Sequence, residues 1–274
     1  MAANPFTYTK AVVCGIPASL PATALRMEET DEPVDLGKAR QQHEDYLQVL
    51  TELVGEVHVI PTDERYPDCV FVEDPVVVCG DTALITIPGH ESRRGETVAM
   101  KEAMEKIGLK IVEMLDPGRM DGGDVLFTGK EFFVGQSQRT NKHGLQQLAA
   151  AFPNFPVTGI PVREGLHLKS FLSMATPNHI AMGSSSAALD AKQLIETEGK
   201  FKYSYRYLQV PDDIGANCLY INGTIVHANN ETFPKSCKVF EKFVDADVKA
   251  KIALSASEVN KVDGCFTCCS VLIN

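Results

Sequence analysis

The sequence predicts an α/β protein in which five similar units close into a ring. Paired apolar strands recur along the 274 residues, helical segments separate these pairs, and one apolar strand remains near each end. A repeat of this length, about fifty residues, is typical of supersecondary units that stack or close on themselves. We expect a single catalytic domain spanning residues 1–274, long enough to bury a sizeable core.

Four stretches have the form of a β-hairpin, with an apolar run, a short polar turn and a second apolar run. They cover residues 68–87, 121–137, 166–183 and 216–229. The polar turns are GD, TGKE, TPN and NGT. Each stretch therefore predicts two antiparallel strands.

Segments with helical periodicity and many charged residues lie outside these hairpins. They cover residues 35–53, 96–109, 139–152, 186–198 and 234–245. Each predicted unit thus combines a hairpin with one helix.

The spacing of the units predicts that the ring is closed by the two terminal strands. The residues that open the apolar runs are Asp68, Asp121, His167, Asn217 and Cys268, at separations of 53, 46, 50 and 51 residues. Four full units leave the apolar runs 11–17 and 268–274 without partners. Pairing them would complete a fifth unit and leave no exposed sheet edge.

A closed ring would bring equivalent positions of its units to one axis. Asp68, Asp121, His167 and Cys268 would then meet there, although burying such groups is costly. Taken singly, an Asp is explained by its turn preference, and His167 by a hydrogen-bonded place in the core. Taken together, they predict a functional site.

Composition limits the partners and the compartment. The net charge of −10 argues against nucleic acid, and no stretch approaches the ~20 apolar residues of a membrane span. The start, MAANPFTYTKAVV, lacks the basic and apolar regions of a signal peptide. We expect a cytoplasmic protein with a small-molecule substrate and no membrane partner, as a monomer or weak homodimer.

The cysteines near the C-terminus allow several interpretations. The eight cysteines should be mostly thiols in a reducing compartment. Cys265 and Cys268 form a lone C-x-x-C with no second pair, which disfavours structural zinc. Strand alternation would place Cys269 on the face opposite Cys268, packed inward.

Six motifs give the sequence a specific resemblance: PDCVFVED (67–74), DGGDVLFTG (121–129), FFVGQSQRTN (132–141), GLHLKSF (165–171), VPDDIGANCLYIN (210–222) and KVDGCFTCCSVLIN (261–274). In this order they closely resemble the dimethylarginine dimethylaminohydrolase family, from about Ala11 to Asn274. The resemblance implies a guanidino-modifying pentein with a five-bladed, pseudo-fivefold α/β propeller. It also implies a role in arginine metabolism and nitric oxide regulation, with no cofactor.

The resemblance implies a catalytic set of Cys268 as nucleophile, His167 as general acid and base, and Asp121 as the partner of the histidine. Many relatives have Glu in place of Asp121. No metal is required, although a Cys268–His167 pair is a potential site for inhibitory zinc.

The resemblance also implies a substrate-binding set. Asp68, Glu73 and Asp74 are expected around the guanidinium and amino ends of the substrate, and Arg93 and Arg139 around its carboxylate. The backbone carbonyls of Leu25 and Val262 are expected to meet the amino group, and Asp263 to line the same pocket. We expect Arg93 to lie on a mobile loop, because PGHESRRGET is rich in Gly and polar residues.

The expected chemistry suits these residue types. Carboxylates can hold the N–H groups of a planar guanidinium, a thiolate can add to its carbon, and a histidine can protonate the departing amine. The implied reaction converts Nω-methylated L-arginines, asymmetric dimethylarginine and monomethylarginine, to L-citrulline and dimethylamine or methylamine. Hydrolysis of unmodified arginine, amidino transfer, and a fold that only binds a ligand or partner are the alternatives. The intact Cys/His/acid set disfavours the last.

Overall fold

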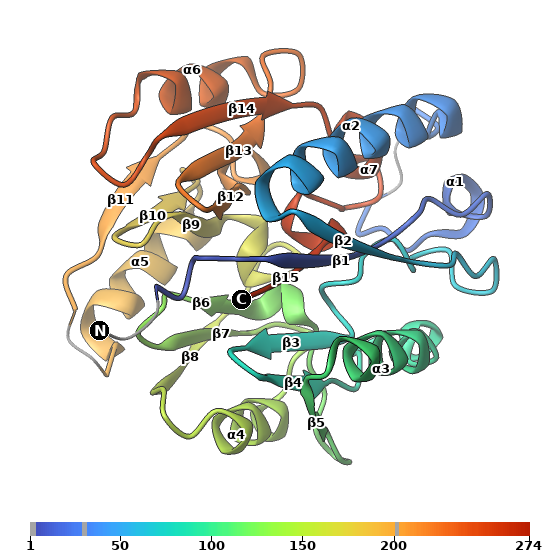
Figure 1. Cartoon of the computed structure of the whole chain (residues 1–274). Helices are drawn as coiled ribbons and strands as arrows, with labels where there is room; N and C mark the ends of the chain where they lie inside the picture. Colours follow the sequence, from blue (N-terminus) through green and yellow to red (C-terminus); the bar gives the residue numbers. More distant parts are fainter. Residues whose placement is uncertain (1–3, 29–31, 201–202) are drawn as a thin grey trace.

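Five small sheets surround the centre of the molecule, and the long helices lie at its periphery (Figure 1). The computed structural model describes residues 4–28, 32–200 and 203–274. Among these residues, no helix combines the length and the apolar character needed to cross a bilayer.

The strands are β1 (Lys10–Cys14), β2 (Glu56–Ile60), β3 (Val76–Cys79), β4 (Thr82–Ile85), β5 (Lys110–Glu113), β6 (Val125–Phe127), β7 (Phe132–Gln136), β8 (Val157–Pro161), β9 (Leu172–Thr176), β10 (His179–Met182), β11 (Arg206–Gln209), β12 (Leu219–Ile221), β13 (Thr224–Ala228), β14 (Ala250–Leu254) and β15 (Val271–Ile273). The α-helices are α1 (Leu20–Thr23), α2 (Leu36–Val54), α3 (Glu96–Ile107), α4 (Lys142–Ala151), α5 (Ser186–Glu198), α6 (Pro234–Lys242) and α7 (Ser257–Asn260). Short 3₁₀ helices are η1 (Glu91–Arg93), η2 (Gly122–Asp124), η3 (Leu168–Ser170), η4 (Ile214–Ala216) and η5 (Thr267–Cys269).

Each sheet contains an antiparallel pair and a third strand that returns, after a helix, parallel to the middle one. The orders are β15-β1-β2, β3-β4-β5, β6-β7-β8, β11-β10-β9 and β12-β13-β14. The four predicted hairpins and the five predicted helices are confirmed. The third strands were not predicted, and they are short strands whose residues are half-buried or exposed in four of the five units.

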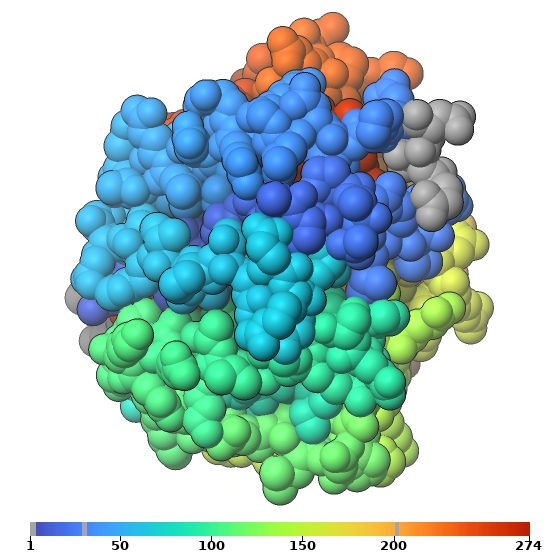
Figure 2. Space-filling view, turned by 90° about the vertical axis from the view of Figure 1, so that its right-hand side faces the viewer, coloured from blue at the N-terminus to red at the C-terminus, as the bar shows by residue number. Residues whose placement is uncertain are grey.

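The chain order can be followed on the surface. Figure 2 shows the side that carries α2, the segment after β2 and α3, where blue, cyan and green regions adjoin one another in sequence order. Consecutive units therefore lie side by side around the ring, as expected for a propeller.

Local sequence signals set the helix boundaries. The side chains of Asp35, Asn141 and Ser185 accept hydrogen bonds from the first turns of α2, α4 and α5. Gly108 ends α3 in the left-handed region at φ 92°, which L-residues rarely adopt. Pro234 begins α6, where its missing N–H costs nothing.

The two terminal strands close the ring, as predicted. β1 and β15 pair antiparallel, with Lys10 opposite Ile273 and Val12 opposite Val271. Val12, Val271 and Ile273 are buried in one cluster with Val76 and Ile85 of the second sheet. The last strand therefore joins the first unit to the second through the core.

The residues that open the apolar runs do not themselves lie on strands, which corrects the predicted strand starts. Asp68 lies in a turn, Asp121 and His167 directly precede η2 and η3, and Cys268 lies within η5. Each of these residues lies in the segment just before a strand, so their side chains gather at one end of the sheets.

Deleting residues 271–274 should abolish cooperative thermal unfolding, because the deletion removes buried side chains and exposes the edge of β1. Ile273→Ala alone should lower the free energy of unfolding by about 2–5 kcal/mol, as is typical for a buried isoleucine. The matched control is Val244→Ala, whose side chain is 88% exposed. A truncated chain with an unchanged melting temperature in calorimetry would disprove closure by β15.

Candidate active site

A small cavity lies where the segments that precede the strands of several units meet. Its volume is about 30 Å³, and its lining residues are Leu25, Asp68, Phe71, Asp74, Arg93, Asp121, Arg139, Leu166, His167, Val262, Asp263, Gly264 and Cys268. All of the residues expected in the site are among them except Glu73. A water needs ~10–15 Å³, so a ligand of amino-acid size requires the walls to move apart.

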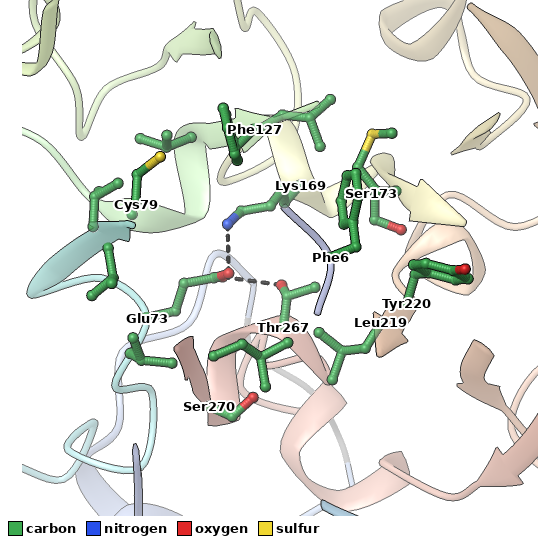
Figure 3. A pocket seen from close by; sticks show the side chains of 18 of the residues that line it. Phe6, Glu73, Cys79, Phe127, Lys169, Ser173, Leu219, Tyr220, Thr267 and Ser270 are labelled. Carbon is green, nitrogen blue, oxygen red and sulfur yellow. Dashed lines mark hydrogen bonds and ion pairs between the residues drawn. The ribbon is translucent and has the colours of Figure 1, made fainter. Parts of the chain in front are cut away.

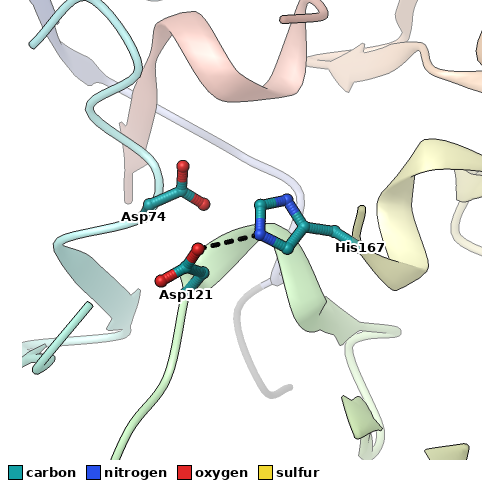
Figure 4. A group of neighbouring side chains, drawn as sticks. All are labelled: Asp74, Asp121 and His167. Atoms are coloured by element: carbon teal, nitrogen blue, oxygen red, sulfur yellow. Dashed lines mark hydrogen bonds and ion pairs between the residues drawn. The ribbon is translucent and has the colours of Figure 1, made fainter. Parts of the chain in front are cut away.

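His167 and Asp121 form a buried pair in this cavity (Figure 4). The Nε2 atom of His167 lies 2.9 Å from Oδ2 of Asp121, and Oδ1 of Asp121 accepts a hydrogen bond from Gly89 N at 2.8 Å. The backbone N–H of His167 donates to Ser170 Oγ at 3.2 Å. Both members of the pair are therefore fixed in orientation.

The two glycines of the DGGD motif allow these segments to approach. A Cβ on Gly123 would lie 2.5 Å from Nδ1 of His167, and one on Gly122 would lie 2.0 Å from the carbonyl oxygen of Glu73. The N–H of Gly123 donates to Oδ1 of Asp74 at 2.9 Å. Any larger residue would separate the histidine from the carboxylates.

His167 is held in its protonated form. Burial lowers its pKa, but Asp74, the hydrogen bond to Asp121 and the nearby Asp124 outweigh burial and raise the pKa to about 10. A histidine of this kind carries a proton at neutral pH and can donate it to a leaving group.

Cys268 lies half-buried in η5, and Glu73 N donates to its carbonyl oxygen at 3.2 Å. Contact with the Cys265 thiol, burial and the carboxylates of Glu73 and Asp74 raise its pKa well above the usual value. These surroundings favour a neutral thiol, and a cation placed beside Cys268 would favour the thiolate. Cys269 is packed into the core as predicted, although the reason is the 3₁₀ turn and not strand alternation.

Arg93 lies in η1 with 5% of its surface exposed, so the predicted mobile loop is wrong. Its guanidinium pairs with Asp74 and with Glu96, where the Nη2–Oε2 distance is 2.7 Å. Nη2 also donates to the carbonyl oxygen of Phe71 at 2.9 Å. Burial raises the pKa of Asp74, but the charges of Arg93 and His167 outweigh burial and lower it. In this conformation Arg93 holds Asp74 in place.

Glu73 faces a neighbouring cavity of about 170 Å³ (Figure 3). Its carboxylate pairs with Lys169 and accepts a hydrogen bond from Thr267 Oγ1 at 3.0 Å. Asn217 joins the same network by accepting from Thr267 N at 3.1 Å. Burial raises the pKa of Glu73, and Lys169 partly offsets this effect. Glu73, Lys169 and Thr267 line this larger cavity, and sequence reasoning did not identify Lys169 or Thr267.

Asp124, the last residue of DGGD, is a further buried carboxylate that sequence reasoning missed. It accepts hydrogen bonds from Ser137 Oγ and Thr140 Oγ1, both at 2.6 Å, and from Leu168 N at 3.0 Å. Burial raises its pKa to about 6, against the opposing effect of His167. The segment that carries His167 is anchored by this carboxylate. The sequence signal that could have identified Asp124 is its position as the second acidic residue of the short glycine-rich motif DGGD.

The remaining cavity residues offer groups to a ligand. Asp68 accepts from Leu25 N at 3.1 Å, and Oδ2 of Asp263 accepts from Met27 N at 2.5 Å. Among the described residues, the guanidinium of Arg139 has no hydrogen bond or ion pair, and it lines the cavity. Val262 completes the wall.

Asp74, Asp121 and His167 each offer a ligand atom, and these atoms lie within 4.8 Å of one another (Figure 4). A metal ion would have to displace the proton that the surrounding carboxylates hold on His167. The local electrostatics therefore favour protonated histidine over a metal centre.

Arg93→Ala should destabilise the fold as well as the site, because it leaves Glu96 and Asp74 buried without their cation. We expect the free energy of unfolding in urea to fall by about 3–5 kcal/mol. Arg65→Ala, which removes an exposed ion pair, is the control. A stable Arg93→Ala variant with only a raised KM would restore the role in carboxylate binding expected from the sequence.

The imidazole of His167 should titrate with a pKa near 10, followed by NMR of ring carbon resonances. The acidic surroundings raise this pKa, so the protonated form persists through neutral pH and is lost as pH rises through about 10. Asp121→Asn should lower this pKa. A midpoint near 6.5 in the native protein would contradict the assigned charge state.

Comparisons with known proteins agree with this geometry. A family model for eukaryotic N,N-dimethylarginine dimethylhydrolase matches residues 22–187. The chain is 36% identical to N(G),N(G)-dimethylarginine dimethylaminohydrolase of Streptomyces coelicolor, over 88% of each protein. It is 34% identical to the Bos taurus protein "Putative hydrolase DDAH2", over 96% of this chain and 93% of that protein.

A solved structure shows the same architecture. The enzyme from Pseudomonas aeruginosa, as a cysteine-to-serine variant in complex with citrulline, superposes with a TM-score of 0.84 at 27% identity. The match covers 97% of this chain and 100% of that one. The fold is the five-bladed α/β propeller of the penteins, and the chain belongs to the dimethylarginine dimethylaminohydrolase family.

Proposed function

We propose that this protein hydrolyses Nω-methylated L-arginines, asymmetric dimethylarginine and monomethylarginine, to L-citrulline and dimethylamine or methylamine. The observation that carries the proposal is the cavity in which a cysteine, a protonated His–Asp pair and several carboxylates meet. The citrulline complex of the Pseudomonas aeruginosa relative supports the product.

The carboxylates would bind and orient the guanidinium. Asp68 lines the cavity and is held through Leu25 N, while Asp74 is fixed by Arg93 and Gly123. Two carboxylates facing one planar cation fix its carbon relative to a nucleophile. The cation would in turn offset the charges of Glu73 and Asp74, which raise the pKa of Cys268. Substrate binding would therefore promote formation of the thiolate.

The reaction would then proceed in two halves. The Cys268 thiolate adds to the guanidinium carbon, His167 donates its proton to the methylated nitrogen, and the C–N bond breaks. This step leaves an S-alkylthiouronium on Cys268 and a neutral His167. His167 then takes a proton from water, and the hydroxide adds to the carbon. The C–S bond breaks, and the hydroxyl proton passes to the departing sulfur, which leaves citrulline and the Cys268 thiol. Asp121 orients the imidazole throughout.

The cellular setting is part of the proposal. All eight cysteines are thiols, which supports a reducing compartment, and we place the enzyme in the cytoplasm as one domain of residues 1–274. It would act on a small molecule without a cofactor, as a monomer or weak homodimer, and zinc bound at Cys268 and His167 would inhibit it.

The deciding experiment is product analysis with dimethylarginine, monomethylarginine, arginine and agmatine, measuring ureido product and released amine. Release of ammonia from arginine as the main reaction would instead favour an arginine hydrolase. A structurally similar arginine dihydrolase domain, at 16% identity, shares the fold alone.

Cys268→Ser should abolish turnover while the melting temperature stays close to that of the native protein, because an alcohol is a far weaker nucleophile than a thiolate. Cys269→Ser is the matched control, since its side chain lies in the core away from the cavity. An active Cys268→Ser variant would remove the nucleophile from this position.

Arg139→Ala should weaken turnover of dimethylarginine and reduce discrimination against agmatine together, because both effects would come from one contact with the α-carboxylate. For the native enzyme, kcat/KM should be roughly 10²-fold lower for agmatine, as is expected when a buried charge loses its partner. Arg26→Ala, outside the cavity lining, is the control. Equal kcat/KM values for both compounds would overturn the role of Arg139.

A further inference from the structure

Two cysteines outside the site lie in contact across the first two units. Cys14 ends β1, and Cys69 lies in the turn segment between β2 and β3. Their Sγ atoms are 3.7 Å apart, and both side chains are buried. A disulfide requires the sulfurs to approach to about 2.05 Å, so the segments that carry the two cysteines must move toward each other.

A small oxidant can reach this pair. Both cysteines line a cavity of about 350 Å³ whose wall also contains Asp63, Arg65 and Glu102. The side chain of Arg65 is 79% exposed, so the cavity adjoins solvent. Hydrogen peroxide is little larger than water and fits this space.

The two thiols differ in reactivity. The Cys14 thiol donates toward the Cys69 sulfur, and this contact lowers the pKa of Cys69 although burial and the charges of Glu96 and Asp63 oppose the shift. The same contact, together with burial, raises the pKa of Cys14. Cys69 is also the more exposed of the two, at 9% against 0% for Cys14, so peroxide reaches Cys69 first and Cys14 resolves the product.

We propose that Cys14 and Cys69 form a peroxide-responsive dithiol that closes to an intramolecular disulfide. The Cys69 thiolate attacks one oxygen of peroxide, the O–O bond breaks, and a sulfenic acid and hydroxide form. The hydroxide takes up a proton as water. The Cys14 sulfur then attacks the sulfenic sulfur, the S–O bond breaks, the S–S bond forms, and a second water leaves. Two thiols are oxidised and one peroxide is reduced.

The disulfide would change the shape of the active-site cavity. Its effect on substrate binding rests on the proposed function, which names the substrate. Cys69 directly follows Asp68 in the chain. The carboxylate of Asp68 accepts a hydrogen bond from Leu25 N, and its backbone carbonyl oxygen accepts one from Arg93 Nη2 at 3.3 Å. Drawing Cys69 toward β1 pulls this segment away from the cavity. Oxidation is thus expected to weaken binding of the guanidinium.

The test uses the Cys268→Ser variant, because it lacks the nucleophile and leaves Cys265 without its cysteine partner. After treatment with hydrogen peroxide, the intact mass should fall by two hydrogens, and peptide mapping should link residues 14 and 69. The control, Cys268→Ser with Cys14→Ser, should gain oxygen on Cys69 and form no link. Sulfinic acid on Cys69 in both variants, or a link between other cysteines, would overturn the dithiol.

Calorimetric binding of dimethylarginine to the Cys268→Ser variant tests the coupling. The Kd should rise at least fivefold after oxidation and return with dithiothreitol, and the control variant should not change. A mapped 14–69 link with an unchanged Kd would refute the coupling to Asp68. Absence of binding before oxidation would instead count against the proposed substrate, while the mass result still decides the dithiol.

Discussion

The concentration of negative charge at the centre of the ring is the constraint on which the site depends. Six buried or nearly buried carboxyl groups lie there: Glu73, Asp68, Asp74, Glu96, Asp121 and Asp124. The cations that form ion pairs with them are Arg93, Lys169 and His167. Burying such groups is tolerated only with partners, so each carboxylate is tied to a cation, a backbone N–H or a hydroxyl.

This charge balance gives each of the three cations a distinct role. Arg93 and Lys169 form ion pairs with buried carboxylates, and the network around Lys169 contacts the backbone of Cys268 through Glu73 and Thr267. His167 is the titratable member, and the surplus of acid around it keeps the proton in place. A cationic ligand would offset the same excess of negative charge. This explains why the acidic residues can both select a guanidinium and keep His167 protonated as the acid that acts on it.

The repeat, the helices and the pairing of the terminal strands could be predicted because they depend on spacing and on apolar runs. The third strands could not, since β5 and β14 lie half-buried or exposed, and their apolar pattern is short. The polar context of Arg93 suggested a mobile surface loop, yet its ion pairs with Asp74 and with Glu96, three residues further along the chain, make it a buried residue. The stretch that contains Arg93 and Glu96 does not reveal that Asp74, which lies before β3, completes this pairing.

The place of Cys268 in the chain has a consequence for synthesis. β1 is made first, and its partner β15 follows roughly 260 residues later, only just after η5. Such a non-local pairing forms late, because the intervening chain must already be ordered. On the ribosome, the earlier units are therefore made and can begin to pack before the proposed nucleophile emerges. The acidic pocket and the thiol are joined in the same event that completes the ring, so an incomplete chain has no assembled site.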